Sequence, residues 1–438
     1  MMKKLFRLVV LAMAIIGIVF GIWFTIKKRV PNISQKEVEE KIFSMIQTKT
    51  AEATSFYTYG RAFNLKGKIT NINKDNFESV KLVITDGKQY EKEYTLTYEF
   101  DETTLNFVSN NEMNAGIILD DLELGEYYIL LRLKLNNSND PRYYSFSNSS
   151  TGEKINYYTI TQDGKNKNAE IDFNKKTFKD NEYNLLTIKL EEAELPTDVY
   201  DIVIDAGHGG TDKGENAGNI TEADVALEYA KLLKTSLEEK GYKVALTRDD
   251  DNSGTYTYTN MYDTDGRITE ACRTKAKLMI SFHINQGNNG LKGLEVYCPG
   301  NSDLTFAEEM ANKIKEYSTI EFSNNNSFKK SEGVYVRNFT KSVIKEFENT
   351  ANRKGYAPYN ITTDTPYLYT IREVGGIATG AYVDGRNTAY DANEYYNSNQ
   401  GIECYQIELG YIKNDLDIIT NEKANYIRGI TEAICNNF

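Results

Sequence analysis

The 438-residue sequence predicts an α/β domain with a central, mostly parallel or mixed sheet and helices on both faces. It also predicts that an all-β, sandwich-like domain and an N-terminal transmembrane helix precede this domain. Three observations lead to these predictions: an uncharged apolar run near the N-terminus, then many short β-branched and aromatic runs between turn residues, then alternating strand and helix patterns. Their order gives four segments: a signal-anchor at 1–29, a helical stalk at 30–55, a sandwich-like accessory domain at 56–196 and the α/β domain at 197–438.

The apolar run covers residues 8–26 and has no charged side chain, close to the ~20 residues that span a bilayer. A cleaved signal peptide has a shorter apolar core followed by small residues, whereas this run ends in Lys27, Lys28 and Arg29. We therefore expect a single-pass protein of the cell membrane, with secretion after cleavage as the alternative. Basic residues flank both ends of the run, so they do not decide its orientation.

The next two segments have different patterns. Val38, Ile42 and Ile46 recur at four-residue spacing and predict a helix, interpreted as a stalk near the membrane. From residue 56, short runs such as YTLTYEF, YYILLRLKL and LLTIKL alternate with turns such as NNSNDP, which predicts an antiparallel sandwich. This segment contains no histidine and no cysteine, so we expect a spacer or binding module whose partner the sequence does not identify.

The α/β pattern begins with the strand VYDIVIDA and the helix EADVALEYAKLLKTSLEEKGY. Further strands are expected at YKVALTR, LMISFHIN, GLEVYC and IECYQIELGYI, and further helices at 265–276, 303–317 and 421–438. In such folds ligands bind at the carboxyl ends of the strands.

The net charge and the cysteine spacing argue against two functions, nucleic-acid binding and a zinc knuckle. The net charge of −12 argues against a nucleic-acid partner, which would need clustered basic residues. Cys272, Cys298, Cys404 and Cys435 have no CxxC spacing, so they do not form a zinc knuckle; disulfides and free thiols both stay open.

The two histidines of the chain both lie at strand ends of the α/β domain. His208 stands in DAGHGGTD and His283 in LMISFHIN. Either one alone is explained by an ordinary core or surface position, but the two together favour a functional site.

Two carboxylates extend this set. Glu222 opens the first helix, where Thr221 and Asp224 have the spacing of a capping box, and helix-end electrostatics alone is the alternative explanation for it. Glu408 lies inside an apolar strand, and a buried charge needs a partner, which is either a catalytic site or a structural salt bridge.

Residues 200–438 resemble a known family through four motifs: GHGGxDxG, a glutamate fourteen residues after its histidine, SxHxN, and an apolar strand carrying E-L-G. They are similar to the zinc-dependent N-acetylmuramoyl-L-alanine amidases of the third amidase type. The resemblance implies one Zn²⁺ held by His208, Glu222 and His283, with Glu408 as the catalytic carboxylate.

The remaining motif residues have minor expected roles. Asp212, Ser281 and Asn285 match the motifs and are expected to shape the loops, and Asn285 and Arg372 are candidates for substrate binding.

The chemistry is coherent with this resemblance. Two imidazoles and one carboxylate leave an open position on zinc, where water becomes acidic enough to react near neutrality. Glu408 would accept the water proton and pass it to the leaving nitrogen.

The resemblance then implies hydrolysis of the amide between N-acetylmuramic acid and L-alanine in peptidoglycan, with the soluble part outside the cell and residues 1–7 in the cytoplasm. The alternatives are a zinc peptidase or deacylase acting on another wall amide, and a non-catalytic, membrane-anchored wall-binding protein.

The sequence departs from the compact form of this family between His283 and Glu408. The surplus lies around 342–360 and 375–404. The segment YLYTIRE between them is expected to be a strand that presents Arg372 to substrate. For the insert around 377–402 we hypothesise a lid over the cleft, and a surface elaboration without a role is the alternative.

Overall fold

The structure is a computed structural model, and it describes residues 33–110, 112–148, 154–159, 166–250, 261–287, 290–355, 359–380, 393–397 and 401–438. The predicted transmembrane run at 8–26 and most of the insert around 377–402 lie outside these residues. Among the described residues, no helix combines the length and apolar character that crossing a membrane requires.

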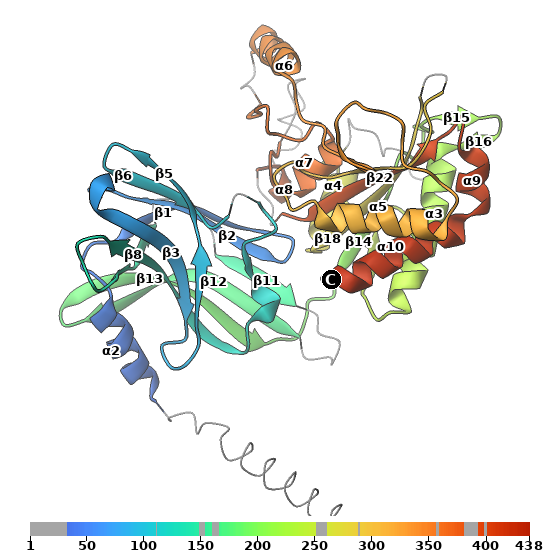
Figure 1. Cartoon of the computed structure of the whole chain (residues 1–438). Helices are drawn as coiled ribbons and strands as arrows, with labels where there is room; N and C mark the ends of the chain where they lie inside the picture. Colours follow the sequence, from blue (N-terminus) through green and yellow to red (C-terminus); the bar gives the residue numbers. More distant parts are fainter. Residues whose placement is uncertain are drawn as a thin grey trace, which may run out of the picture.

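The first unit consists of two β-sheets that share one core (Figure 1). Leu65 and Phe107 of one sheet pack in the same cluster as Leu82 and Ile129 of the other, so the two sheets form a sandwich. The pairs are antiparallel except β1 with β10. The first sheet contains β1 (Ala51–Tyr59), β2 (Ala62–Ile69), β5 (Thr97–Asp101), β6 (Thr104–Val108), β7 (Ile117–Ile118) and β10 (Phe146–Asn148). The second contains β3 (Phe77–Thr85), β4 (Glu91–Thr95), β8 (Gly125–Leu135), β9 (Arg142–Tyr144), β11 (Ile155–Thr159), β12 (Lys167–Phe178) and β13 (Asn181–Glu192).

Helix α2 (Gln35–Met45) lies on the outer face of the second sheet. Ser34 and Glu37 form a capping box at its start, and Val38 and Ile42 pack against Val83 of β3. The predicted helical periodicity is therefore confirmed, but the helix covers a sheet instead of standing clear as a stalk. The apolar side that suggested a helix is used for this packing, and β1 begins at residue 51, before the expected boundary at 56.

The second unit is a mixed α/β fold, as predicted. Its main sheet has the order β17 (Val244–Leu246), β14 (Ile202–Ala206), β18 (Leu278–Asn285), β22 (Glu403–Tyr411), β19 (Glu295–Tyr297), β21 (Val334–Tyr335) and β20 (Lys329–Ser331). Neighbouring strands are parallel except β22 with β19 and β21 with β20. A small hairpin, β15 (Asn216–Ala217) and β16 (Ile220–Thr221), precedes the first helix.

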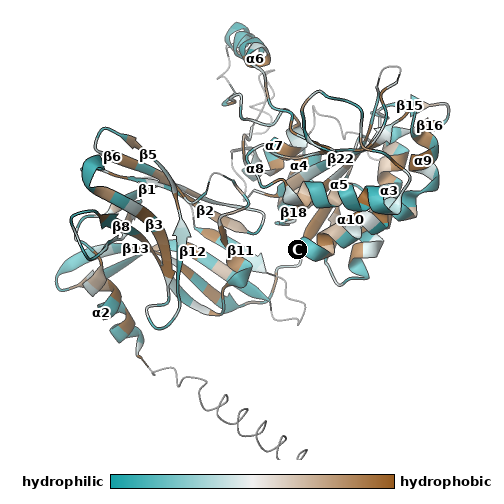
Figure 2. Cartoon of the chain, viewed as in Figure 1, coloured by the Kyte–Doolittle hydropathy of each residue, from teal (hydrophilic) through white to brown (hydrophobic). Residues whose placement is uncertain are grey.

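Helices cover both faces of this sheet (Figure 1). One face is covered by α3 (Glu222–Glu238), α5 (Thr305–Tyr317), α9 (Leu416–Asn421) and α10 (Lys423–Asn437). The other is covered by α4 (Arg267–Arg273), α7 (Tyr369–Val374) and α8 (Glu394–Asn397). In Figure 2 these helices are teal and brown on different sides, the pattern expected of helices with one buried face.

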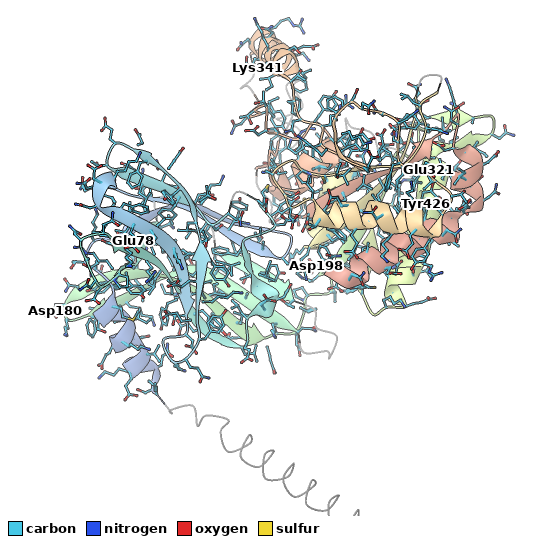
Figure 3. The ribbon with its side chains drawn as sticks, viewed as in Figure 1. Glu78, Asp180, Asp198, Glu321, Lys341 and Tyr426 are labelled. Carbon is cyan, nitrogen blue, oxygen red and sulfur yellow. The ribbon has the colours of Figure 1, made fainter. Side chains whose placement is uncertain are left out.

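Two segments between His283 and Glu408 differ from expectation. YLYTIRE is not a strand, because Tyr369–Val374 forms helix α7. The next strand in the chain, β22, is already paired on both sides, by β18 and β19, and the segment packs over the sheet face through Ile371 and Val374. The first of the two extra segments, around 342–360, contains most of helix α6 (Lys341–Lys354). This helix projects away from the sheet beyond Lys341 (Figure 3).

The sandwich contacts the amino-terminal ends of the central strands of the α/β unit. Gly60 N–H donates to the Gly401 carbonyl at 3.0 Å, just before β22, and the Lys277 ammonium, just before β18, donates to the Tyr158 carbonyl. Asp198, in the connecting segment, lies between the two units in Figure 3. The carboxyl ends of the same strands, where a site is expected, are therefore at the opposite edge of the sheet.

Candidate metal centre

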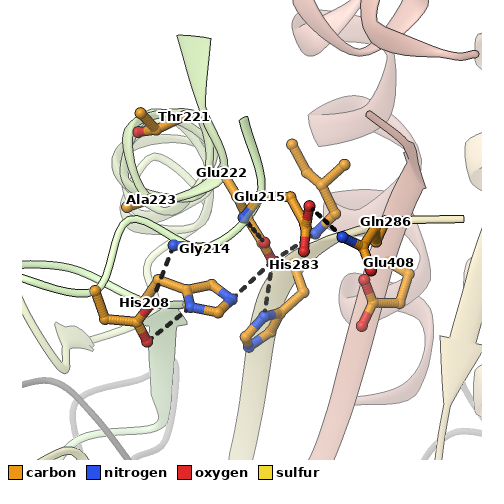
Figure 4. A network of polar contacts seen from close by, with 12 residues as sticks. His208, Gly214, Glu215, Thr221, Glu222, Ala223, His283, Gln286 and Glu408 are labelled. Atoms are coloured by element: carbon orange, nitrogen blue, oxygen red, sulfur yellow. Dashed lines mark hydrogen bonds and ion pairs between the residues drawn. The ribbon is translucent and has the colours of Figure 1, made fainter. Parts of the chain in front are cut away.

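Three side chains predicted as metal ligands converge at the carboxyl edge of the sheet (Figure 4). His208 follows β14, His283 is the sixth residue of β18, and Glu222 is the first residue of α3. One nitrogen or oxygen from each lies within 4.8 Å of the other two. Glu222 Oε1 is 3.0 Å from His208 Nε2 and 3.0 Å from His283 Nδ1. The sequence interpretation of these residues as one cluster therefore agrees with their positions.

The backbone of the first motif is bent tightly to present His208. His208 itself has φ 56°, in the left-handed region that a residue with a Cβ rarely adopts. A Cβ on Gly207 would lie 2.6 Å from the His283 ring, and one on Gly214 would lie 2.5 Å from Glu222 Oε2. The absence of a side chain at these two glycines leaves the space that the rings and carboxylate of the cluster occupy.

Neighbouring groups fix the orientation of the ligands. Asp212 Oδ2 is 2.9 Å from His208 Nδ1, so this carboxylate orients the imidazole and leaves Nε2 for a metal. Glu222 accepts hydrogen bonds from the backbone N–H of Glu215 and of Ile284, both at 2.9 Å. Asp212 thus bonds both to the loop backbone at Gly214 and to His208, the predicted ligand.

Without metal, the pKa values of His208 and Glu222 are shifted from their usual values. Burial lowers the pKa of His208, but hydrogen bonds to Glu222 and then Asp212 outweigh burial and raise it to about 9. Burial raises the pKa of Glu222, but the two imidazoles bonded to this carboxyl outweigh that effect and hold its pKa well below the usual range. Glu222, only 3% exposed, is therefore a carboxylate, and its charge is compensated by imidazole.

A buried ion pair stabilises the backbone of the loop that carries His208. Asp205 and Arg267 are bonded to each other and almost completely buried. The Arg267 guanidinium also donates to the carbonyls of Ala206, at 2.9 Å, and His208, at 2.8 Å. Ser281 Oγ donates to Asp205 at 2.6 Å, so this motif residue, expected to shape a loop, instead bonds to the neighbouring strand. Sequence patterns did not identify Asp205 or Arg267.

Glu408 lies beside the cluster. It is register partner to His283 in the parallel pair β18–β22, so both side chains lie on the same face of the sheet. It is 8% exposed and accepts a hydrogen bond from Gln406 Nε2 at 2.8 Å. Burial raises the pKa of Glu408, His283 opposes this shift, and Glu222 adds to it. A raised pKa suits a group that must both accept and return a proton near neutral pH.

Glu295 is a residue of this region that the sequence analysis missed. It pairs with Glu408 across β19–β22, and it is fully buried. Within the described part of the chain, its carboxylate accepts five hydrogen bonds, all from neutral side chains. The donors are Asn285, Tyr297, Ser323, Asn325 and Tyr411. A glutamate inside the apolar run GLEVYC is the same signal that identified Glu408, so the sequence did contain it.

The two substrate-binding candidates, Asn285 and Arg372, form hydrogen bonds to other groups of the protein. Asn285 lies at the end of β18, two residues after His283, and its amide donates to Glu295. Arg372 is buried in α7, and its guanidinium donates to Tyr359 Oη at 2.8 Å and to the Tyr367 carbonyl. The expectation that Arg372 is presented from a strand is wrong, because the helix turns it into the protein.

The cysteines do not contribute to the site. Cys272, Cys298 and Cys404 are buried free thiols, and Cys435 is an exposed one.

The donor set fits zinc. Two imidazole nitrogens and one carboxylate oxygen are ligands that zinc prefers, and three protein ligands leave a fourth position for water or substrate. With a buried carboxylate of raised pKa on the next strand, the fold and the site define a candidate metal-dependent hydrolase.

Comparison with known proteins gives the family. Residues 202–437 match the family described as N-acetylmuramoyl-L-alanine amidase (Amidase_3), and the chain belongs to that family. It is an amidase of this type.

Two curated relatives and one solved structure are similar to parts of this chain. The endolysin of Bacillus phage SPP1 is 41% identical over 96 residues, which cover 22% of this chain and 32% of the endolysin. The germination-specific N-acetylmuramoyl-L-alanine amidase of Bacillus subtilis is 36% identical over 97 residues, 21% of this chain and 41% of that protein. The chain thus spans less than half of either relative. Among solved structures, the N-acetylmuramoyl-L-alanine amidase AmiC2 of Nostoc punctiforme matches 55% of this chain and 96% of its own, at 22% identity and a TM-score of 0.33.

Proposed function

We propose that the chain hydrolyses the amide between N-acetylmuramic acid and L-alanine in peptidoglycan with one zinc ion held by His208, Glu222 and His283. The observation that carries the proposal is the position of Glu222 between the two imidazoles, with Glu408 next to His283 on the adjoining strand. Bound zinc would supply Lewis-acid polarisation of the amide carbonyl and a more acidic water.

The protein groups have separate tasks in this proposal. Asp212 holds His208 in the orientation that exposes Nε2, and the backbone N–H of Ile284 and Glu215 hold the Glu222 carboxylate. Glu408 takes the proton from water and delivers it to the nitrogen of L-alanine, so that the products are a lactyl carboxylate and a free amino group. Burial raises the pKa of Glu408 to about 7, so near neutral pH the group can accept the proton from water and release it again.

The experiment is digestion of purified muropeptides by the full chain, with products identified by mass spectrometry. We expect a new L-alanine amino terminus, loss of activity with a chelator, and recovery with zinc. The Glu408→Gln variant should bind zinc normally and lose about 10²–10⁴-fold in rate, the usual contribution of a general acid–base. Cleavage at another amide would favour the peptidase or deacylase alternative, and unchanged behaviour of Glu408→Gln would favour a wall-binding protein.

We further propose that residues 8–26 anchor the chain in the cell membrane, with the catalytic unit outside. The uncharged run in the sequence and the location of peptidoglycan outside the membrane support this placement. In fractionated cells the full chain should be found with membranes, and protease added to intact protoplasts should remove the catalytic unit. A chain that protease reaches only after lysis contradicts the orientation.

A further inference from the structure

The outer face of the first sheet carries a groove of about 570 Å³ where the sandwich meets the α/β unit. We call it the junction groove. Its polar lining includes Tyr57, Lys66, Thr97, Asn106 and Asn110 of the sandwich and Asn301 of the α/β unit.

The strand register places these sandwich side chains on one face. Lys66 pairs with Val108, and Asn106 pairs with Lys68, while the alternating residues Leu65 and Phe107 point into the core. Since side chains alternate between the faces of a strand, Lys66 and Asn106 project outward together. Tyr57 joins them, because Lys66 Nζ lies 5.8 Å from the centre of its ring.

We propose that the junction groove binds the glycan strand of peptidoglycan. A sugar ring offers a C–H face and a rim of hydroxyl and acetamido groups. The face of the Tyr57 ring, with its partial negative charge, matches the C–H face, and side-chain amides can both donate and accept at the rim. Asn301 Oδ1 is buried and has no hydrogen-bond partner among the described residues, so this amide has bonding capacity left. The inference rests on the proposed function, because that function supplies the glycan.

The groove has a fixed position relative to the metal centre. Met113 N–H donates to the Asn301 carbonyl at 2.8 Å, and Asp303 N–H donates to Asn114 Oδ1 at 2.7 Å. Asn114 also donates to Glu403, the first residue of β22. Glu408 is five residues further along this strand, about 17 Å at roughly 3.3 Å per residue. A ligand that occupies both places must therefore span a distance of this order, which a glycan strand can do.

The test measures binding of glycan strands without stem peptides to the full chain carrying Glu408→Gln, which prevents turnover. Adding Tyr57→Ala should weaken binding roughly 2- to 12-fold, the effect of losing one aromatic contact. Tyr57→Phe keeps the ring and should retain most of the affinity, which controls for folding. Lys66→Ala should weaken binding, whereas Lys68→Ala, on the same strand and face but outside the groove, should not.

Activity gives the second measurement. With Glu408 restored, Tyr57→Ala should lower kcat/KM on polymeric peptidoglycan and leave cleavage of a single-disaccharide muropeptide unchanged. Equal glycan affinity in all variants, or an equal loss for Lys66→Ala and Lys68→Ala, overturns the inference. Failure of the unsubstituted chain to cleave any muropeptide would instead overturn the proposed function.

Discussion

Replacing Arg267 with methionine tests whether the buried ion pair holds the His208 loop. The substitution keeps a long side chain but leaves the Asp205 carboxylate buried without its cation. Breaking a buried ion pair on one side costs roughly 3–5 kcal/mol. In a folding unit of this size about 1 kcal/mol moves the unfolding midpoint by roughly 2–4 °C, so we expect a loss of roughly 6–20 °C.

The assay is thermal unfolding followed by circular dichroism, together with a zinc-competition titration. Zinc affinity should fall as well, because the His208 carbonyl loses its donor. Arg273→Met, on the same helix but paired with Glu270 near the surface, is the matched control and should change stability by less than about 1 kcal/mol.

A double-mutant cycle completes the test. Asp205→Asn with Arg267→Met removes both charges and should recover part of the lost stability, which gives a coupling energy between the two sites. The reasoning is refuted if Arg267→Met costs less than about 1 kcal/mol, or if the two single losses simply add.

Three further predictions concern the metal centre. Gly214→Ala and Gly218→Ala impose similar backbone strain, at φ 62° and 65°, but only the first puts a Cβ 2.5 Å from Glu222, so it alone should weaken zinc binding strongly; equal losses contradict this. Asp212→Asn should weaken zinc binding about 10- to 100-fold without changing the circular dichroism spectrum, and an unchanged affinity would mean that Asp212 does not orient His208. Because the pKa of His208 is about 9 without metal, zinc affinity should rise about tenfold per pH unit up to about pH 9 and then level off. The same raised pKa stabilises the metal-free protein at pH values below about 6.5, the pKa of histidine in the unfolded chain, and this stabilisation is lost as the pH rises through 9. A zinc affinity that does not change with pH in chelator competition contradicts the first expectation, and a thermal stability that does not change with pH contradicts the second.

The sequence predicted the cluster well because strand ends are local features. His208, His283 and Glu408 each lie in or just after an apolar strand, and parallel strands bring such positions to one edge of the sheet. Glu222 was accessible to the same reasoning, because the Thr221 cap fixes where its helix begins.

The supporting residues were harder to predict because their partners are distant in the sequence. Arg267 and Asp205 are 62 residues apart, and nothing local in DGRITEA shows that its arginine is buried. The helix around Arg372 was mistaken for a strand because aromatic and β-branched residues fit a strand, while the pairing of β22 with a strand on each side is a property of the whole sheet. The docking of α2 likewise depends on a sheet assembled from later residues.

The five neutral donors around Glu295 have a consequence for the ionic strength in which this enzyme can work. Salt screens exposed charges over about 8–10 Å, but it acts much less on a buried carboxylate that dipoles hold in place. Glu222 is likewise buried, and its partners are two backbone N–H groups and the imidazoles of His208 and His283. The site itself should therefore keep its geometry from dilute buffer to concentrated salt. Any salt dependence of the rate should then come from the encounter of a chain with net charge −12 with its charged substrate.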